Sequence, residues 1–578
     1  MTHVLQRCLA GLAMIGAAAA VGGCGGGGGG SGSGDPSSRQ GGSSSTVKRG
    51  GVFRIAANDG IDTMNPFNAI NSDTHNAFQN IYSFLVQYDT KTFDYAGDLA
   101  TSWKTLNGGR DWRFKIRSNA KWSDGRPLTA KDVADVMNWA TSPKLDGLGL
   151  VGEIFGGHLK SASASDPQTL TLHYDQPVAI VLSKLAKWPI LDPKQWLGFK
   201  TAAAAGQFQN TAPISSGPFV VTSYAKRQLL LTKANPDYYG RKPYIDGWGL
   251  KQYDNIDAAI QALTSGEIDA VEAVPGPSFA SLSRNKSLKA VAAPSAFVSD
   301  LIINSNPNKT SHRELLNPKL REAFADAIDK SSLVRLIHAG KGQPADSIVP
   351  KAYGKFPGTS KPSHAPGLPQ DHYDPAAANR ILDGLGYKRG AGGTRVANGA
   401  PMSYTVIVPT DAYTGVTRVS DLFKRWFSAI GVNLTIKPLD STAAYNEIIG
   451  TQAATKTPQN SYKTFDLSLW NWTSRPDPES LLLVATTDSY GSLSDSGYSN
   501  PAYDRDYRRQ FTEINPDKRL AILWEMQRML ARDRPYIPLV WADKLQAWST
   551  KWTGLRETPQ GFFNESSNAN LLNVHQAG

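Results

Sequence analysis

Cysteine is nearly absent from this chain, and its scarcity excludes several kinds of chemistry. The 578 residues include two cysteines, Cys8 and Cys24, both close to the N-terminus. Beyond them the sequence offers no disulfide, no thiol nucleophile and no thiolate metal site. The nine histidines are far apart, with His364 and His372 the closest pair, so no helical pair of zinc ligands exists. We therefore expect neither a bound metal nor a cofactor.

Sequence signatures of common enzymes are missing as well. The chain has no Gly-x-x-x-x-Gly-Lys-Ser/Thr phosphate loop, no Gly-x-Gly-x-x-Gly after a strand pattern and no Gly-x-Ser-x-Gly elbow. The stretch Asn107-Gly108-Gly109 lacks the spacing of a glycine loop and indicates a turn. We predict that the protein is not an enzyme and has no catalytic residues. A hydrolase whose triad assembles from distant residues is a remote alternative.

A long apolar run occurs only near the N-terminus. Arg7 precedes the apolar stretch Leu9 to Val21, which is too short to cross about 30 Å of hydrocarbon. The tetrapeptide Val21-Gly22-Gly23-Cys24 resembles the lipobox of bacterial lipoproteins. The resemblance implies that residues 1–23 are a removed signal peptide and that lipidated Cys24 anchors the protein at the extracytoplasmic face of the cell membrane. The alternative is an ordinary secretory signal with an incidental cysteine.

Residues 24–51 form a linker rich in glycine and serine, which cannot bury enough apolar surface to fold. The net charge of +11 becomes +10 when Arg7 leaves with the signal. A basic exported protein could attract anionic lipid head groups or cell-wall polymers, but the lysines and arginines are scattered. We interpret them as a solvated surface and expect no nucleic-acid partner.

Strand and helix patterns alternate along the rest of the chain. Trp112, Phe114 and Ile116 alternate with charged residues, which indicates a strand with one buried face. Helix starts are predicted at Thr129, where Asp132 completes a pattern close to a capping box, and at the pairs Asn317-Pro318, Asp374-Pro375 and Asn515-Pro516. Pro535 precedes an apolar strand predicted over 537–541. Interleaved elements of this kind predict an α/β protein.

A dozen short segments follow one another in a fixed order between about 52 and 556. They include Leu99-Ala100-Thr101-Ser102-Trp103, Lys121-Trp122-Ser123-Asp124-Gly125, Ser216-Gly217-Pro218-Phe219, Asn235-Pro236-Asp237-Tyr238-Tyr239, Ser265-Gly266-Glu267-Ile268-Asp269, Ala327-Ile328-Asp329-Lys330 and Phe465-Asp466-Leu467. In this order they resemble the family 5 extracellular solute-binding proteins, the oligopeptide, dipeptide and nickel receptors of ATP-binding-cassette (ABC) importers.

The resemblance implies a two-lobed, periplasmic-binding-protein-like fold of the cluster C type, with an extra subdomain and a hinged ligand cleft. The first lobe would comprise residues 52–88, 213–300 and 530–578, the extra subdomain 89–212 and the second lobe 301–529. The expected partners are a peptide or small-molecule ligand and the subunits of an ABC permease, and the expected state is a monomer. A membrane-tethered assembly or regulatory factor for envelope polymers could reuse the same fold.

The resemblance also places ligand contacts in loops that face the cleft. They are Asn65, Ser216, Asn304 and two tryptophans, Trp470 and Trp472. The tryptophans are two residues apart, so on a strand they share a face, and Trp472 would stand over the pocket. Aromatic side chains with a few polar groups are typical of small-molecule sites, although both rings could instead pack in the core.

One departure from the family pattern concerns the residues that follow Trp472. Peptide-binding members carry an aspartate there that pairs with the ligand's α-ammonium, whereas this chain has Arg475, and Asp477 is the only nearby acid. Because an arginine repels an ammonium, either Asp477 takes over or the ligand is not a free peptide N-terminus. An anionic or uncharged polar ligand is then plausible, with Arg475 offering a bidentate fork to a carboxylate.

Overall fold

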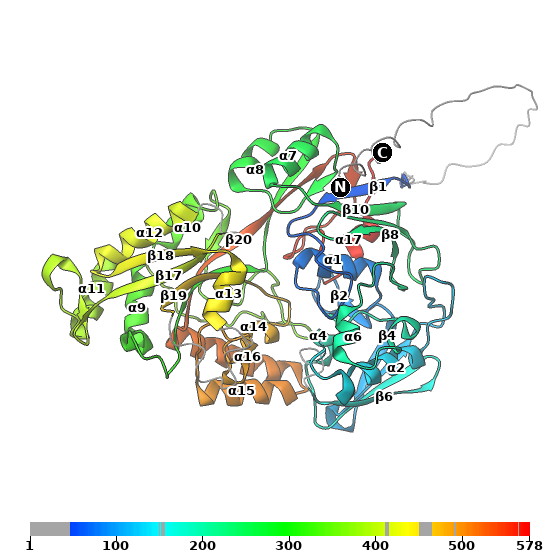
Figure 1. Ribbon diagram of the computed structural model, residues 1–578, viewed down its shortest axis with the longest axis horizontal. Coiled ribbons are helices and arrows are strands. Elements are labelled where there is room, and N and C mark those ends of the chain that lie inside the picture. Colours follow the sequence, from blue (N-terminus) through cyan, green and yellow to red (C-terminus); the bar gives the residue numbers. More distant parts are fainter. Residues whose placement is uncertain are drawn as a thin grey trace, which may run out of the picture. The chain divides into compact units, whose positions relative to one another are not determined.

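The computed structural model describes residues 47–148, 151, 157–410, 416–449, 465–490, 493–564 and 566–578. The predicted signal peptide, Cys24 and most of the linker therefore lie outside the described residues. Helices and strands interleave along the described chain, as the sequence predicts for an α/β protein (Figure 1).

The first lobe is built on a mixed sheet around β1. Its strands are, in spatial order, β11 (Ala270–Val271), β1 (Val52–Ala56), β10 (Gly247–Lys251), β9 (Leu229–Ala234) and β8 (Phe219–Ala225), and β12 (Leu288–Pro294) belongs to the same lobe. The helices are α1 (Ser72–Ile81), α7 (Ile256–Ser265), α8 (Gly276–Leu282) and α17 (Ala569–Asn573). Phe53 and Ile55 of β1 are buried, while Arg54 between them faces the other way and pairs with Asp269 at 2.8 Å.

The extra subdomain is a four-stranded antiparallel sheet with short helices. Its strand order is β4 (Ala100–Leu106), β5 (Asp111–Ile116), β7 (Thr169–Tyr174) and β6 (Leu159–Asp166). The helices are α2 (Ala130–Ala140), α4 (Val181–Leu185), α5 (Pro193–Trp196) and α6 (Ala202–Gln207). Phe114 of β5 and Phe53 of β1 belong to one hydrophobic cluster, so the subdomain shares its core with the first lobe.

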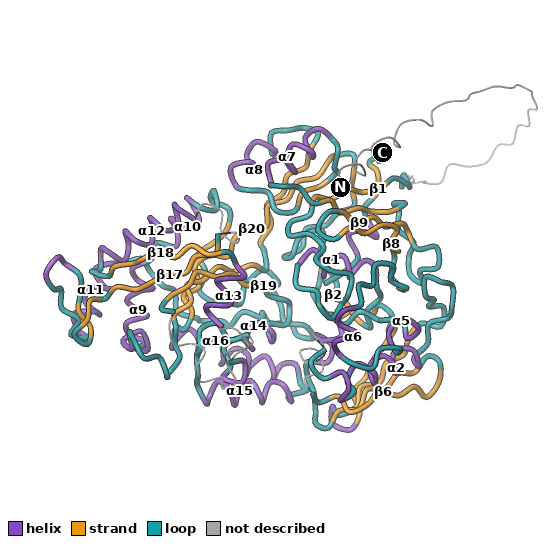
Figure 2. Tube along the Cα trace, viewed as in Figure 1, coloured by secondary structure: helices purple, strands orange, loops and turns teal. Residues whose placement is uncertain are grey.

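The second lobe has helices on both faces of its sheet (Figure 2). The strands are β18 (Asn433–Leu439), β17 (Ser403–Pro409), β19 (Leu467–Thr473), β13 (Phe297–Ile303) and the short β14 (Gly342–Pro344). One face packs α9 (Pro318–Ala327), α11 (Pro375–Gly384) and α12 (Val416–Ala429), with α10 (Lys330–Leu336) also in contact. The other face packs α13 (Ser441–Ile449), α14 (Glu479–Leu483), α15 (Pro501–Thr512) and α16 (Pro516–Asp533).

Three short two-stranded pairs complete the described strands. They are β2 (Val86–Tyr88) with β3 (Tyr95–Gly97), β15 (Val396–Ala397) with β16 (Ala400–Pro401), and β21 (Trp552–Thr553) with β22 (His575–Gln576).

One long strand, β20 (Tyr536–Ser549), belongs to both lobes. Its first residues pair with β13 of the second lobe, and its last residues pair with β12 and β11 of the first. β12 and β13 are consecutive in the chain, so two strands cross between the lobes side by side. The strand predicted over 537–541 is the second-lobe part of β20. The sequence did not indicate the rest of β20, because the apolar run ends at the polar residues Asp543 and Lys544.

The predicted helix starts are confirmed. Thr129 accepts a hydrogen bond from the backbone of Asp132, whose side chain accepts one in return, so the capping box is complete. Asn317, Asp374 and Asn515 each cap a helix with proline at its first position. Glycine is required at position 217 for lack of space rather than for a positive φ. A Cβ at this position would lie 2.5 Å from the carbonyl oxygen of Ile81.

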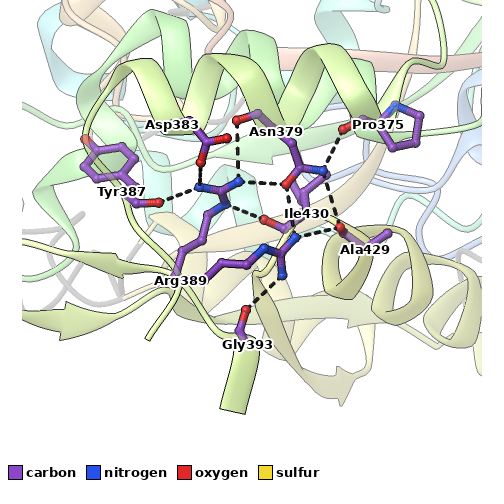
Figure 3. A network of polar contacts seen from close by, with 9 residues as sticks. Pro375, Asn379, Asp383, Tyr387, Arg389, Gly393, Ala429 and Ile430 are labelled. Atoms are coloured by element: carbon purple, nitrogen blue, oxygen red, sulfur yellow. Dashed lines mark hydrogen bonds and ion pairs between the residues drawn. The ribbon is translucent and has the colours of Figure 1, made fainter. Parts of the chain in front are cut away.

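A buried arginine, Arg395, ties α11 to the end of α12, and Figure 3 labels its partners Asn379, Asp383, Tyr387 and Ile430. Arg395 is 1% exposed and donates to the carbonyl oxygen of Ile430 at 2.8 Å and to Asp383 at 2.5 Å. Its guanidinium also reaches Asn379 at 2.7 Å, which itself donates to the Pro375 carbonyl. Each of the three guanidinium nitrogens therefore donates to an acceptor. An arginine must meet this condition to be buried without a large free-energy cost of desolvation.

Candidate functional site

A small cavity, with room for about one water molecule, lies where loops of the two lobes meet. The first lobe and the extra subdomain contribute the segments around Tyr88 and around Asn564, and the second lobe contributes Tyr353 and Pro476. The complete lining is Tyr88, Asp89, Thr90, Phe93, Tyr353, Pro476, Thr558, Pro559, Gln560, Asn564, Ser566 and Ser567.

Backbone hydrogen bonds hold these loops at the point where the chain crosses between lobes. Ala296, between β12 and β13, donates to the Pro559 carbonyl at 2.7 Å and accepts from Ser474 at 2.9 Å. Tyr353 donates its hydroxyl to the Ser474 carbonyl at 2.8 Å. The cavity walls are thus attached directly to one of the crossing segments.

The cavity lining combines aromatic rings with uncharged polar side chains. Its single charged residue, Asp89, accepts hydrogen bonds from the backbone of Lys91 at 2.9 Å and of Thr92 at 2.8 Å. Partial burial acts to raise the pKa of Asp89, but these hydrogen bonds outweigh it and lower the pKa. The carboxylate is therefore engaged in its own turn, and the lining as a whole presents polar groups without a dominant charge.

Asp477, next to the lining residue Pro476, is fully engaged in an ion pair. Both its oxygens contact Arg519 of α16, at 2.6 Å and 3.0 Å, and the side chains are 0% and 6% exposed. The hydroxyl of Tyr95 donates to the same carboxylate at 3.3 Å across the junction of the lobes. An ammonium could reach Asp477 only by displacing a bidentate, buried arginine.

Two further ion pairs join the extra subdomain to the second lobe. Lys184 of α4 contacts Glu479 of α14 at 3.1 Å, with side chains 7% and 3% exposed. Asp94 contacts Lys355 at 2.5 Å and accepts from the Gly358 backbone at 3.0 Å. These contacts hold the lobes together in this structure.

Three of the sequence-predicted ligand contacts are buried inside single lobes. Asn65 donates to the carbonyl oxygens of Ala205 and Phe208, each at 2.8 Å, and so attaches its loop to α6. Asn304 donates to the Phe465 carbonyl at 2.8 Å. Ser216 is 0% exposed, and its backbone carbonyl accepts from Ser83 at 2.9 Å. None of the three lines the cavity described above.

The two tryptophans lie on the same face of β19, as their spacing predicts. Both are half-buried and pack against the hydrophobic cluster beneath α13 to α16. Trp472 also donates its indole N–H to Asp495 at 3.1 Å. Arg475 is 8% exposed and stands close to Tyr88, since its charge opposes the rise in the pKa of Tyr88 that burial causes.

Asp495 is part of a buried acidic pair that the sequence did not reveal. The hydroxyl of Tyr536 donates to it at 2.6 Å. Burial raises the pKa of Asp495 to about 7 despite this bond. Asp300 of β13 is 0% exposed, and burial followed by the charge of Asp495 raises its pKa as well.

Sequence reasoning missed most of the cavity lining. Asn564, Ser566 and Ser567 lie in the tail after the last long strand, and Tyr353 lies in a segment with no regular element. The polar residues after Pro559 could have indicated this part of the lining, since binding residues are often found on loops. Nothing in the sequence indicated which loop of the other lobe it would face.

No group of three or more potential metal ligands is found among the described residues. None of the helices in this part of the chain combines the length and hydrophobicity that a membrane crossing requires.

A family model described as bacterial extracellular solute-binding proteins, family 5, matches residues 94–492. An ABC transporter peptide-binding protein of Brucella abortus is 25% identical, over 82% of this chain and 84% of its own. Protein XP55 of Streptomyces lividans is 27% identical, over 88% of this chain and 86% of its own. The oligopeptide-binding protein AppA of Bacillus subtilis, solved with a nonapeptide, has a TM-score of 0.75 at 20% identity and covers 92% of this chain and 100% of its own. The last likeness confirms the two-lobed fold.

The Asp477–Arg519 pair gives a first prediction. Arg519→Met leaves a buried carboxylate without its cation and should lower the free energy of unfolding by about 3–5 kcal/mol in urea titrations. Arg508→Met is the matched control, because Arg508 forms an exposed pair with Asp488 and should cost less than about 1 kcal/mol. Equal losses in the two variants would contradict the structural role of the pair.

The acidic pair gives a second prediction, on the pH dependence of stability. A carboxyl whose pKa rises on folding favours the folded state at low pH, and this contribution is lost as pH rises from about 4 through about 7. Asp300→Asn removes one charge of the pair, so it should raise the melting temperature more at about pH 8 than at about pH 5. Asp517→Asn, which alters a half-exposed carboxylate, should change neither value. A melting temperature that Asp300→Asn lowers at the higher pH would refute the assignment.

Proposed function

The chain belongs to the bacterial extracellular solute-binding proteins of family 5, and we propose that it is the substrate-binding component of an ABC importer. It captures a peptide or a similar polar solute outside the cytoplasm and delivers it to a membrane permease. The Brucella and Bacillus proteins, whose names describe peptide binding, support this choice of solute. Neither catalysis nor a cofactor is part of the proposal.

The observation that carries the proposal is the position of the cavity. Its walls come from both lobes and are attached to Ala296, in one of the two segments that cross between lobes. A solute that contacts both walls favours the closed arrangement, and closure changes the outer surface that a permease would meet. We propose that the lobes have about the ranges predicted from the sequence, with their boundaries between β12 and β13 and within β20, and that they move about these crossing strands.

The aromatic side chains of β19 support a peptide or similar solute, because large rings offer apolar contact area at small-molecule sites. We propose that Trp470 and Trp472 bind the solute together with Arg475, whose fork suits a carboxylate. Asn65, Ser216, Asn304 and Asp477 then act by supporting the loops around the solute.

We further propose that Cys24 is lipidated and that the protein acts as a monomer on the extracytoplasmic face of the membrane. Residues 25–51 would serve as a flexible tether with a reach of roughly 30 Å, which lets a closed, loaded protein reach its permease without leaving the membrane. The basic net charge of the chain is compatible with a position close to anionic lipid.

A test of solute binding starts with native mass spectrometry of the purified protein, which identifies any solute that copurifies. When that solute is returned to protein stripped of it, the radius of gyration in solution scattering should fall and the melting temperature should rise by mass action. Tight binding with unchanged scattering would contradict closure. A cleft that stays empty while a protein partner copurifies would favour a regulatory factor.

The anchor can be tested separately by cell fractionation. Cys24→Ala should move the protein from the membrane fraction to the soluble fraction or leave it with an uncleaved signal, since the acyl chains supply the hydrophobic anchoring. Cys8→Ala is the matched control, because Cys8 lies within the predicted signal. A Cys24→Ala protein that fractionates and migrates like the parent would contradict lipidation.

A further inference from the structure

Asp300 is a buried carboxyl group that lies on β13 and is 0% exposed. Neither of its side-chain oxygens has a hydrogen-bond partner among the residues that the structure describes. An ionised carboxylate in such a position is strongly disfavoured unless a cation or several donors compensate it. The structure therefore contains a place where positive charge would be strongly favoured.

Asp495 lies close enough to Asp300 for its charge to raise the pKa of Asp300, and the strand register places two of its hydrogen-bond donors on either side of Asp300. Asp300 pairs with Trp470 on β19 and with Pro538 on β20. Trp472 on β19 pairs with Val298, two residues before Asp300. Tyr536 on β20 pairs with Ile302, two residues after Asp300. Both of these side chains donate to Asp495, at 3.1 Å and 2.6 Å, so its carboxylate spans the position of Asp300.

Three other carboxylates of the second lobe with buried side chains are paired with cations. Asp371 contacts Lys330 at 2.7 Å and Arg534 at 2.5 Å, and Asp466 contacts Lys309 at 2.9 Å. Asp346 contacts Lys351 at 2.9 Å. The side-chain donors to Asp495 are neutral, and Asp300 has no donor, so neither carboxyl group has a positive partner among the described residues. Burial is the main cause of the raised pKa of both carboxyl groups, and the charge of Asp495 raises the pKa of Asp300 further.

Aromatic side chains occupy positions next to the acidic pair. Trp470 and Trp472 are half-buried, and Tyr445 of α13 is 37% exposed with its ring centroid 6.4 Å from that of Trp470. Tyr445 is also close enough to Asp495 for that charge to raise its pKa, after the larger effect of burial. Carboxylates behind aromatic faces bind organic cations well, because the ring quadrupole and the negative charge act in the same direction.

We propose that Asp300 and Asp495 form a buried binding site for a cationic group of the transported solute, an amine or a guanidinium. The proposal rests on the proposed function and adds the class of solute: one that carries at least one organic cation. The cation enters past Tyr445 and Trp470, displaces the proton that the carboxyl pair holds, and forms the ion pair that the pair lacks. A peptide would supply such a group from its N-terminus or from a lysine or arginine side chain, and a polyamine would supply it directly.

The test uses the full mature chain and a panel of defined probes in calorimetric titrations. The cationic probes are Ala-Ala-Ala, N-acetyl-Ala-Lys-Ala, agmatine and spermidine, and the uncharged controls are N-acetyl-Ala-Ala-Ala and N-acetyl-Ala-Gln-Ala. At least one cationic probe should bind the parent at least tenfold more tightly than its uncharged counterpart. Asp300→Asn and Asp495→Asn should each remove that preference, whereas Asp517→Asn, a half-exposed carboxylate of the same lobe, should retain it.

The outcomes separate this site from the proposed function. A parent that binds no cationic probe, or a preference that survives in both Asn variants, overturns the cation site. Stabilisation by magnesium chloride alone that Asp300→Asn abolishes also overturns it, because the pair would then be a metal site. A copurified neutral or anionic solute that closes the lobes would overturn the cation site and leave the transport proposal standing. A protein that neither retains a solute nor closes would instead contradict the transport proposal.

Discussion

The structure depends on two adjacent strand segments that belong to both lobes. β20 leaves the second-lobe sheet at about Val540 and continues into the first-lobe sheet, and β12 followed by β13 makes the same crossing in the opposite direction. Each lobe is therefore a separate helix-covered sheet, yet neither can move without bending these segments. The cavity is built from loops attached next to this crossing, and its walls come from both lobes. Under the proposed function, a solute held there would contact both lobes in the closed arrangement.

Several buried charges of the second lobe are paired with a group of opposite charge. Arg395 satisfies its guanidinium with carbonyl groups and Asp383, and Arg519 does so with Asp477. Such pairs fix the geometry around them, since removal of one partner leaves a buried charge without compensation. Asp300 differs from these residues because neither of its oxygens has a hydrogen-bond donor among the described residues. Buried ionisable groups with strongly shifted pKa values are enriched at functional sites, which favours a role in ligand binding or proton exchange for Asp300.

The fold was largely predictable from the sequence, whereas the site was not. Local rules identified the capping box at Thr129 and the proline-initiated helices, because they involve residues three or four positions apart. The family resemblance supplied the two-lobed fold, and the register of Trp470 and Trp472 followed from their spacing. The cavity joins Tyr88, Tyr353 and Asn564, which are hundreds of positions apart and share no local pattern. The pairing of Asp477 with Arg519 could not be predicted either, since it depends on how α16 packs beneath a loop.

The pairing of Asp477 bears on where a positive charge of the solute can be placed. With Arg475 in the loop after β19 and Asp477 neutralised by Arg519, that loop offers little to an ammonium. Asp300 provides negative charge one strand away, at the β13 position where the register with β20 shifts between Ser299 and Asp300. A cation at Asp300 would act on the strand pair that joins the lobes, only four residues from Ala296 and the cavity wall. A cation that replaces the proton held by the acidic pair would turn a neutral pair into an ion pair on β13, so under the proposal the charge of the solute and the position of the lobes are linked through this strand.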